Sequence, residues 1–209
     1  MSAYRDRIYP YLVSLLGDPK PIRDLRRQII RLARGTVLEV GSGSGANFPH
    51  YDRARVRKLY ALEPNARMIV LAEPQRPVNL AVEYLELSGE RIPLQDGSVD
   101  SVVSTFTLGT IPDVHSALRG VRRVLRPEGI LIFLELGLSR DAVVRRWQRR
   151  WEPTAHWLFE GLHLTRDMPS LIVESGFQIE TLETKYLATF PKSWTFCCWG
   201  TARVSKNTP

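Results

Sequence analysis

The segment Thr36-Val-Leu-Glu-Val-Gly-Ser-Gly-Ser-Gly-Ala-Asn47 decides the fold that we predict for this chain. Its first five residues are mostly β-branched or apolar and lie between Gly35 and Gly41, which predicts a short buried strand that feeds a glycine turn. Gly41, Gly43 and Gly45 allow positive φ and let another molecule approach the main chain. The residues after the turn are expected to begin a helix whose free N–H groups point back at it. Together these features predict a nucleotide-type binding site.

A carboxylate follows at the distance that such a site requires. Lys58-Leu-Tyr-Ala-Leu-Glu63-Pro-Asn lies roughly twenty residues beyond the turn and predicts a second strand that ends at Glu63. A carboxylate at a strand tip can accept hydrogen bonds from two adjacent ribose hydroxyls. Pro64 limits the exit direction, and Asn65 can cap the next helix. The alternative is an ordinary solvated glutamate at a strand end.

Five blocks in order along the chain resemble those of one enzyme family: Glu39-Val-Gly-Ser-Gly-Ser-Gly, the strand end at Glu63, Ser88-Gly-Glu-Arg-Ile-Pro-Leu94, Asp96-Gly-Ser-Val-Asp-Ser-Val-Val-Ser104 and Val124-Leu-Arg-Pro-Glu-Gly129. They resemble the class I S-adenosylmethionine-dependent methyltransferases with a type 11 domain. A nicotinamide-binding Rossmann domain would share the first two features, and Gly41-x-Gly43-x-x-Ala46 fits its fingerprint. It has no counterpart for the later blocks, so we favour the methyltransferase.

The resemblance implies S-adenosylmethionine as cofactor and S-adenosylhomocysteine as its product. The glycine turn would hold the methionine part, and Glu63 the ribose. Ser88 stands where the family often has Asp, so Ser88 or Glu90 would have to replace the usual hydrogen bond to the adenine amine. The residues expected to bind the cofactor are Glu39, Gly41, Ser42, Gly43, Asn47, Glu63, Pro64, Ser88, Gly89, Glu90, Thr105 and Phe106.

Strands alternate with helices along the chain. Residues 78–87, 99–104 and 130–136 are predicted strands, and Asp113 is a predicted helix N-cap. This pattern predicts an α/β fold with a mostly parallel, doubly wound sheet. The resemblance implies a Rossmann-like sheet of seven strands with an antiparallel last strand.

We expect a single methyltransferase domain spanning residues 1–209. Helices at 4–16 and 22–34 form an N-terminal cover (1–34), and most arginines of the second helix should be exposed (Arg23, Arg26, Arg27, Arg31 and Arg34). The cofactor-binding core spans 36–136, a helical lid 140–174, and a final strand pair 176–204.

The lid carries an aromatic stripe. Val143, Trp147 and Trp151 recur every four residues, and four arginines fill other positions (Arg145, Arg146, Arg149 and Arg150). We favour a lid whose tryptophans pack on the domain while its arginines face water. The alternative is peripheral contact of 140–157 with a membrane surface. The following block, Glu160-Gly-Leu-His163-Leu-Thr-Arg166-Asp, resembles a subgroup that methylates small thiols.

The subgroup resemblance favours a small, apolar thiol as acceptor, with His163 and Glu135 as candidate catalytic residues. A thiol reacts as thiolate, and His163 or Arg166 would stabilise that negative charge. A quinol or phenol oxygen would need a base, for which Glu135 and His163 are candidates. A lipid head group is a further alternative. Glu135 could instead be a structural tie to the neighbouring loop. No usual zinc-ligand spacing occurs, so no metal is expected.

Composition narrows the function classes. The chain has 209 residues, a net charge of +7 and a pI near 9.7, which favours anionic partners without deciding the fold. A nicotinamide-dependent oxidoreductase and a basic cofactor- or nucleic-acid-binding module are the competing classes, and no nucleic-acid partner is expected. Early charges and short apolar runs predict neither a signal peptide nor a membrane span, so we expect a cytoplasmic protein. Cys197 and Cys198 are adjacent strand residues.

Overall fold

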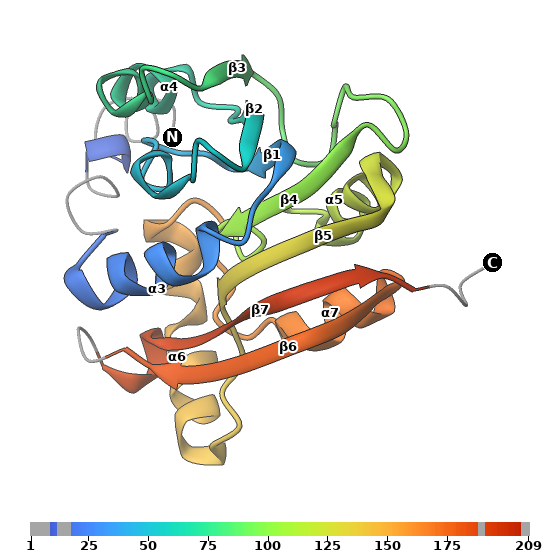
Figure 1. Ribbon diagram of the computed structural model, residues 1–209. Helices are drawn as coiled ribbons and strands as arrows, with labels where there is room; N and C mark the ends of the chain where they lie inside the picture. Colours follow the sequence, from blue (N-terminus) through green and yellow to red (C-terminus); the bar gives the residue numbers. More distant parts are fainter. Residues whose placement is uncertain (1–8, 12–17, 188–190, 206–209) are drawn as a thin grey trace.

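The computed structural model describes residues 9–11, 18–187 and 191–205, and these form a seven-stranded sheet in the order β3-β2-β1-β4-β5-β7-β6 (Figure 1). The first five strands pair in parallel, and β7 is antiparallel to both β5 and β6. This confirms the predicted fold class. The strands are β1 (Gly35–Val40), β2 (Val56–Leu62), β3 (Ala81–Leu85), β4 (Val99–Thr105), β5 (Leu125–Leu136), β6 (Phe177–Tyr186) and β7 (Phe196–Val204).

Helices cover both faces of the sheet. On one face, α5 (Val114–Val124) and α7 (Met168–Glu174) pack against a core that contains Leu38, Val102 and Phe133. On the other face, α3 (Lys20–Ile30) and α4 (Ala66–Ala72) pack against Val37, Val103 and Ile132. Successive residues of one strand point to opposite faces, so the neighbouring Val102 and Val103 of β4 belong to different cores. Cys197 and Cys198, next to each other on β7, are both buried and belong to opposite cores.

The N-terminal and glycine-turn helices differ from the prediction. The first cover helix, 4–16, lies mostly outside the described residues, and the second is shorter than expected. The expected helix after the glycine turn is reduced to a single 3-10 turn, η1 (Phe48–His50). Pro49 explains this, because it has no N–H to continue a helix and disfavours helical φ/ψ for Phe48.

The fifth strand begins earlier than predicted. Helix α5 ends at Val124 and β5 begins directly at Leu125 instead of Ile130. Leu125 pairs with Val99 and Ile130 with Ser101, so the residues between them form an irregular stretch. Pro127 lies in that stretch, where the missing N–H costs no ladder hydrogen bond.

The remaining long helix, α6 (Ala142–Leu158), lies beyond the end of β5 (Figure 1). Asp141 caps it by accepting hydrogen bonds from the backbone N–H groups of Val143 and Val144. Its inner side meets a small apolar cluster around Ala155, Leu162 and Leu164. Among the helices of the described residues, none is long and apolar enough to cross a membrane.

Candidate active site

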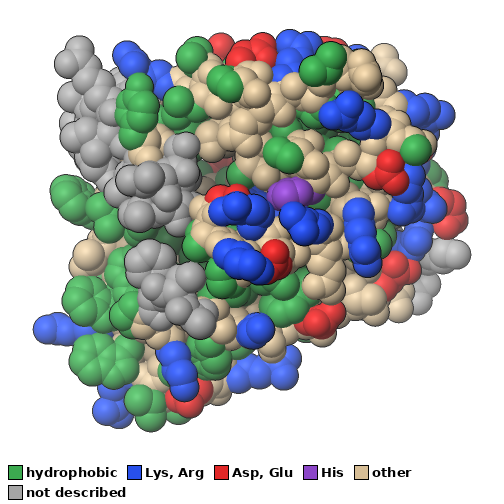
Figure 2. All heavy atoms as spheres, turned by 60° about the vertical axis from the view of Figure 1, so that its left-hand side comes forward, with side chains coloured by type: hydrophobic (Ala, Val, Ile, Leu, Met, Phe, Trp, Pro, Cys, Tyr) green, Lys and Arg blue, Asp and Glu red, His purple; other side chains and the backbone are tan. Residues whose placement is uncertain are grey.

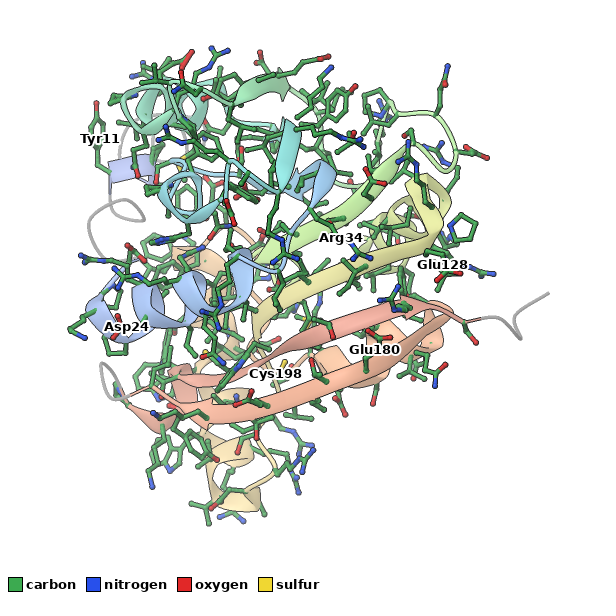
Figure 3. The ribbon with its side chains drawn as sticks, viewed as in Figure 1. Tyr11, Asp24, Arg34, Glu128, Glu180 and Cys198 are labelled. Atoms are coloured by element: carbon green, nitrogen blue, oxygen red, sulfur yellow. The ribbon has the colours of Figure 1, made fainter. Side chains whose placement is uncertain are left out.

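The candidate site lies where parallel strands end at the same edge of the sheet. Val40 pairs with Leu62 of β2 and with Ser104 of β4, so the residues after these three strands are neighbours. Open α/β sheets bind ligands at this carboxyl edge. In Figure 3, Asp24 of α3 lies toward this side of the molecule, whereas Glu128 and Glu180 lie away from it.

The glycine turn is built for a close approach of the backbone. Gly41 has φ +68°, and a Cβ there would lie 2.3 Å from Cγ2 of Thr107. Gly43 has φ +53°, and the atom nearest to its hypothetical Cβ is Met68 Cε at 3.8 Å, an ordinary van der Waals distance, so this glycine is not crowded. The hydroxyl of Ser42 is buried and has no hydrogen-bond partner among the described residues. The uncrowded backbone at Gly43 and the unpaired Ser42 hydroxyl together fit a polar ligand such as the methionine part of the cofactor.

Glu63 lies at the tip of β2, as the spacing predicts. One carboxylate oxygen accepts a hydrogen bond from the Gly43 N–H and the other from the Asn65 N–H, each at 3.0 Å. These bonds fix the carboxylate between the glycine turn and α4, which Asn65 caps after Pro64. A carboxylate oxygen can accept more than one hydrogen bond, so this arrangement is compatible with two ribose hydroxyls.

Glu39 and Asn47 hold the glycine turn in place through buried hydrogen bonds. The Glu39 carboxylate is almost fully buried and accepts hydrogen bonds from Asn47 Nδ2 and the Tyr51 hydroxyl, both at 2.8 Å. Burial raises the pKa of Glu39 to about 7, while hydrogen bonds from Tyr51 and Asn47 oppose the rise. Asn47 Nδ2 also donates to Thr105 Oγ1 at 2.9 Å, which joins the turn to the tip of β4.

Arg26 completes this network, and its predicted exposure was wrong. Only 7% of the residue is exposed, and its Nη1 donates to Asn47 Oδ1 at 2.8 Å and Thr105 Oγ1 at 2.7 Å. The guanidinium also lies 5.3 Å from the ring centre of Phe106, a residue with φ +55°. The burial of Arg26 could have been predicted from the sequence. Arg26 lies four residues from both Ile22 and Ile30, so it is on the same side of the helix as these apolar residues.

Glu135 is enclosed beneath the loop that follows β4. It is 0% exposed and accepts hydrogen bonds from Ser104 Oγ at 2.7 Å, the Thr107 N–H at 3.0 Å and the Leu108 N–H at 3.2 Å. Burial raises its pKa to about 7, and these hydrogen bonds oppose the rise. A carboxyl that cannot reach an acceptor fits the structural alternative, a tie that shapes the loop, better than the catalytic one.

The block after β3 passes over the tip of β1. A Cβ on Gly89 would lie 2.8 Å from Ile111 Cδ1 and 3.1 Å from Val40 Cγ1, so a larger residue here would require these side chains to shift. The Ser88 hydroxyl donates to Glu90 at 2.8 Å, and the other Glu90 oxygen accepts from the Asp113 N–H at 2.8 Å. Glu90 is therefore tied to the start of α5, next to Ser88.

His163 is held between α6 and the loop after β4. Its Nδ1 lies 2.9 Å from Glu152 Oε1, and its backbone N–H donates to the Gly109 carbonyl at 2.9 Å. Glu152 also accepts from Leu164 and Thr165, so it fixes the whole loop. Glu152 was not among the predicted site residues, although it is the only acidic residue within α6.

Arg166, considered above as a group that could stabilise a thiolate, instead binds backbone carbonyls. Its guanidinium donates to the backbone carbonyls of Leu108, Ile111 and Pro112, which braces the loop after β4. Burial lowers the pKa of Arg166, whereas the charges of Glu152 and Glu135 oppose this. Within the described residues, no three or more His, Cys, Asp or Glu side chains are grouped to hold a metal ion.

The favoured interpretation, in which the tryptophans of the lid pack on the domain, holds for Trp151, which contacts Trp194, but not for Trp147. Trp147 is 51% exposed, Trp157 69% and Val143 67%, while Trp151 is 40% exposed despite its contact with Trp194. The buried residues of α6 are instead Val144, Gln148 and Ala155. Gln148 decides this orientation, because its amide bonds to the Ser139 N–H and the Gly137 carbonyl, both at 2.9 Å.

Comparisons with known proteins agree with this geometry. A methyltransferase domain model matches residues 38–133. The thiol S-methyltransferase TMT1B of Rattus norvegicus is 30% identical over 190 residues, which cover 84% of this chain and 77% of the relative. TMT1B of Homo sapiens is 31% identical over 175 residues, covering 76% and 70%.

Solved structures show the same fold. The cyclase SpnF aligns with a TM-score of 0.73 at 18% identity, over 98% of this chain and 94% of SpnF. A Thermotoga maritima S-adenosylmethionine-dependent methyltransferase, described as a possible histamine N-methyltransferase, aligns with a TM-score of 0.60 at 18% identity, over 98% and 93%. Fold likeness alone does not fix a reaction. The family match and the relatives together show an S-adenosylmethionine-dependent methyltransferase, and the chain belongs to the methyltransferase family that includes the thiol S-methyltransferases.

Proposed function

We propose that this methyltransferase transfers the methyl group to the thiol of a small, apolar molecule, with His163 as the residue that takes the thiol proton. The names of its relatives support a thiol acceptor. The observation that carries the role of His163 is its position, bonded to Glu152 on one side and to the Gly109 carbonyl on the other. The backbone N–H of His163 makes the second bond, so the residue lies beside the loop that follows β4, which supports a role at this edge of the sheet.

The cofactor side of the proposal assigns roles to the strand-edge residues. When bound, S-adenosylmethionine supplies an electrophilic methyl group on its sulfonium. The turn from Gly41 to Gly45 would hold the methionine part, with the buried hydroxyl of Ser42 as a donor or acceptor toward it. Glu63 would accept from the ribose hydroxyls. The adenine and sulfonium would lie against the remaining predicted residues: Ser88, Gly89, Glu90, Thr105 and Phe106.

Glu39 would not contact the cofactor itself. It would hold Asn47 and, through Asn47, Arg26 in the positions that shape the turn. Glu39 is too deeply buried to reach a ligand, but its bond to Asn47 fixes the side chain that also meets Arg26 and Thr105. Because this network already orders the turn in the free protein, ligand binding loses less conformational entropy. The Arg26 guanidinium is already paired, because its Nε lies 3.3 Å from Asp18 Oδ1, so Arg26 would hold the turn rather than bind the cofactor.

The acceptor side depends on the tautomer of His163. When the Glu152 carboxylate accepts a hydrogen bond from Nδ1, the other ring nitrogen, Nε2, carries a lone pair and can accept a proton. Nε2 would take the proton of the incoming thiol and leave a thiolate, which is the nucleophilic form. His163 is part-exposed, as a group that meets a substrate has to be.

A methyl-transfer panel tests this proposal. Alkyl thiols, aryl thiols, phenols, quinols, amines and a phospholipid would each be incubated with the protein and labelled cofactor. Turnover of thiols alone supports the proposal, whereas turnover of oxygen or nitrogen acceptors without thiols would contradict it. Thermal melting tests the cofactor site separately. S-Adenosylhomocysteine at 100 times its dissociation constant should stabilise the fold by about 2.7 kcal/mol, and NADH should give no shift.

A further inference from the structure

We propose that the outer face of α6, defined by Val143, Arg146, Trp147, Arg150 and Trp157, binds the surface of an anionic lipid bilayer. The inference concerns a surface and holds whichever acceptor the enzyme methylates. It starts from the finding that Trp147 and Trp157 are more than half exposed, while the buried residues of α6 are Val144, Gln148 and Ala155.

The apolar part of this outer face is large for an exposed helix. More than half of the surface of Val143, Trp147 and Trp157 is exposed. Trp147 follows Val143 by one helical turn, and residues four apart lie on the same side of a helix, so these side chains form one stripe. Indole rings favour the boundary between head groups and acyl chains, because each has an apolar body and a polar N–H.

Apart from Asp141, the exposed N-cap residue of α6, the exposed charges around the stripe are basic. Arg146, Arg149 and Arg150 of α6 are exposed, and Arg140 is exposed just before the helix begins. The one acidic residue of α6, Glu152, is turned inward to His163 and Thr165. Figure 2 shows hydrophobic and basic side chains side by side at its lower left. A basic, tryptophan-bearing face matches an anionic interface, where each arginine adds to the attraction.

The same charges argue against a second copy of this chain as the occupant. In a symmetric dimer the same patch meets itself, so the arginines of both copies would face one another rather than carboxylates. Like-charge juxtaposition of this kind disfavours association. Single-stranded nucleic acid could also meet arginines and stacked indoles. We favour the bilayer because the stripe includes Val143. Its aliphatic side chain can insert among acyl chains but can neither stack on a base nor bind a phosphate.

The position of α6 would give such binding a consequence for the enzyme. The inner side of the helix carries Glu152, which fixes His163, while its outer side carries the stripe. Lys192 and Trp194 of η3 (Lys192–Trp194) lie beside it, and Trp194 contacts both Trp151 and Phe159. A helix bound to the membrane through its outer face would bring the acceptor side of the enzyme to the surface where apolar molecules partition.

Vesicle co-sedimentation at low ionic strength tests the inference. The full chain would be mixed with vesicles of phosphatidylcholine alone and with vesicles containing one quarter phosphatidylglycerol. We expect binding only to the anionic vesicles, and release at high salt. R146Q/R150Q should lower the partition coefficient about 30-fold, given the contribution of each basic residue near an anionic surface. W147A should lower it about tenfold, given the apolar area removed.

The matched control is R53Q/R91Q, which removes the same charge from exposed arginines on other elements. It should bind nearly as the unmodified chain does. Equal losses in the two double variants, or no binding to anionic vesicles at all, would overturn the inference. So would tighter binding to single-stranded nucleic acid than to vesicles, or a dimer that W147A dissociates. Every variant would first be checked for the melting shift with S-adenosylhomocysteine, which separates a failure of this surface from a failure of the cofactor site.

Discussion

The strand-edge site and the outer face of α6 use charged side chains in opposite ways. At the strand edge, Glu39, Glu135 and Arg26 are all buried, and each is bonded to backbone or side-chain groups of the turn and loop. On α6, Arg146 and Arg150 are exposed among tryptophans.

The contrast separates two kinds of function. A buried charge is costly unless it is paired, and its hydrogen bonds then hold the surrounding backbone in one shape. An exposed charge does little for stability, so arginines gathered on one face act through what they meet outside the molecule. The first region is therefore built to present a fixed site, and the second to meet a surface. The following changes test that distinction.

The largest effect is expected from His163→Gln. Losing a general base typically lowers kcat by about 10²–10⁴-fold, and the affinity for S-adenosylhomocysteine should stay unchanged because the strand edge is intact. The loss should be larger for alkyl thiols than for aryl thiols, which ionise more readily and need less help. Steady-state assays with both thiol classes measure this. His115→Gln, an exposed histidine on α5, is the control. Equal kcat for the two variants would remove His163 from the mechanism.

Gly41→Ala should show how rigid the strand edge is. A left-handed φ costs an alanine about 1–2 kcal/mol, and the clash with Thr107 should add about 1–3 kcal/mol. Denaturant unfolding and cofactor binding by calorimetry measure the two consequences. Gly97→Ala is the matched control, because Gly97 has φ +58° but no described atom within 4 Å of its hypothetical Cβ. If both variants lose the same free energy of unfolding and both still bind cofactor, the contact between position 41 and Thr107 does not restrict the turn as we expect.

Glu63→Gln should weaken cofactor binding selectively. Removing the negative charge that would accept from the ribose should raise the dissociation constant for S-adenosylhomocysteine about 30-fold, given the strength of hydrogen bonds to charged groups. Glu83→Gln is the control, since Glu83 lies exposed on the neighbouring strand β3 and pairs with Lys58. Titration calorimetry gives both constants. A Glu63 variant that binds as tightly as the control would contradict the ribose assignment.

The smallest effect concerns pH and Glu135. Its pKa is about 7 in the folded state against 4.5 for an unperturbed glutamate, so the folded state retains a proton that the unfolded state has lost between these values. The stability that this proton contributes is fully present below pH 4.5 and is lost as the pH rises through 7. Glu39 behaves in the same sense. Glu135→Gln should therefore reduce the fall in melting temperature between about pH 5 and pH 8. Glu128→Gln, on the exposed part of β5, should leave that fall unchanged.

The sequence predicted the strand edge better than α6 for a physical reason. The strand Gly35–Val40, the turn after it and the position of Glu63 follow from local patterns, because strand alternation and glycine φ are properties of a few consecutive residues. Periodicity on α6 also placed Trp147 and Trp151 on one side. It could not say which side packs, since that depends on Gln148 meeting a turn that follows β5.

Contacts between distant segments account for the other differences. Arg26 is buried because α3 lies across the sheet close to Thr105, which is 79 residues further along the chain. Glu152 meets His163 only because the chain folds back after α6. The helix expected to begin after the glycine turn is limited by Pro49 to the single turn η1, as the position of this proline in the sequence indicates. Residues 1–8 and 12–17, where the first cover helix was expected, lie outside the described residues.

The two cysteines of β7 bear on how the proposed thiol methyltransferase would keep its own thiols unreactive. Burial raises the pKa of the Cys197 thiol to about 12 and that of Cys198 further still. Thiol–disulfide exchange needs a thiolate and access to it, and neither side chain offers either one. We therefore expect the folded protein to resist mixed-disulfide formation with oxidised thiols, because its own thiols are neither ionised nor accessible.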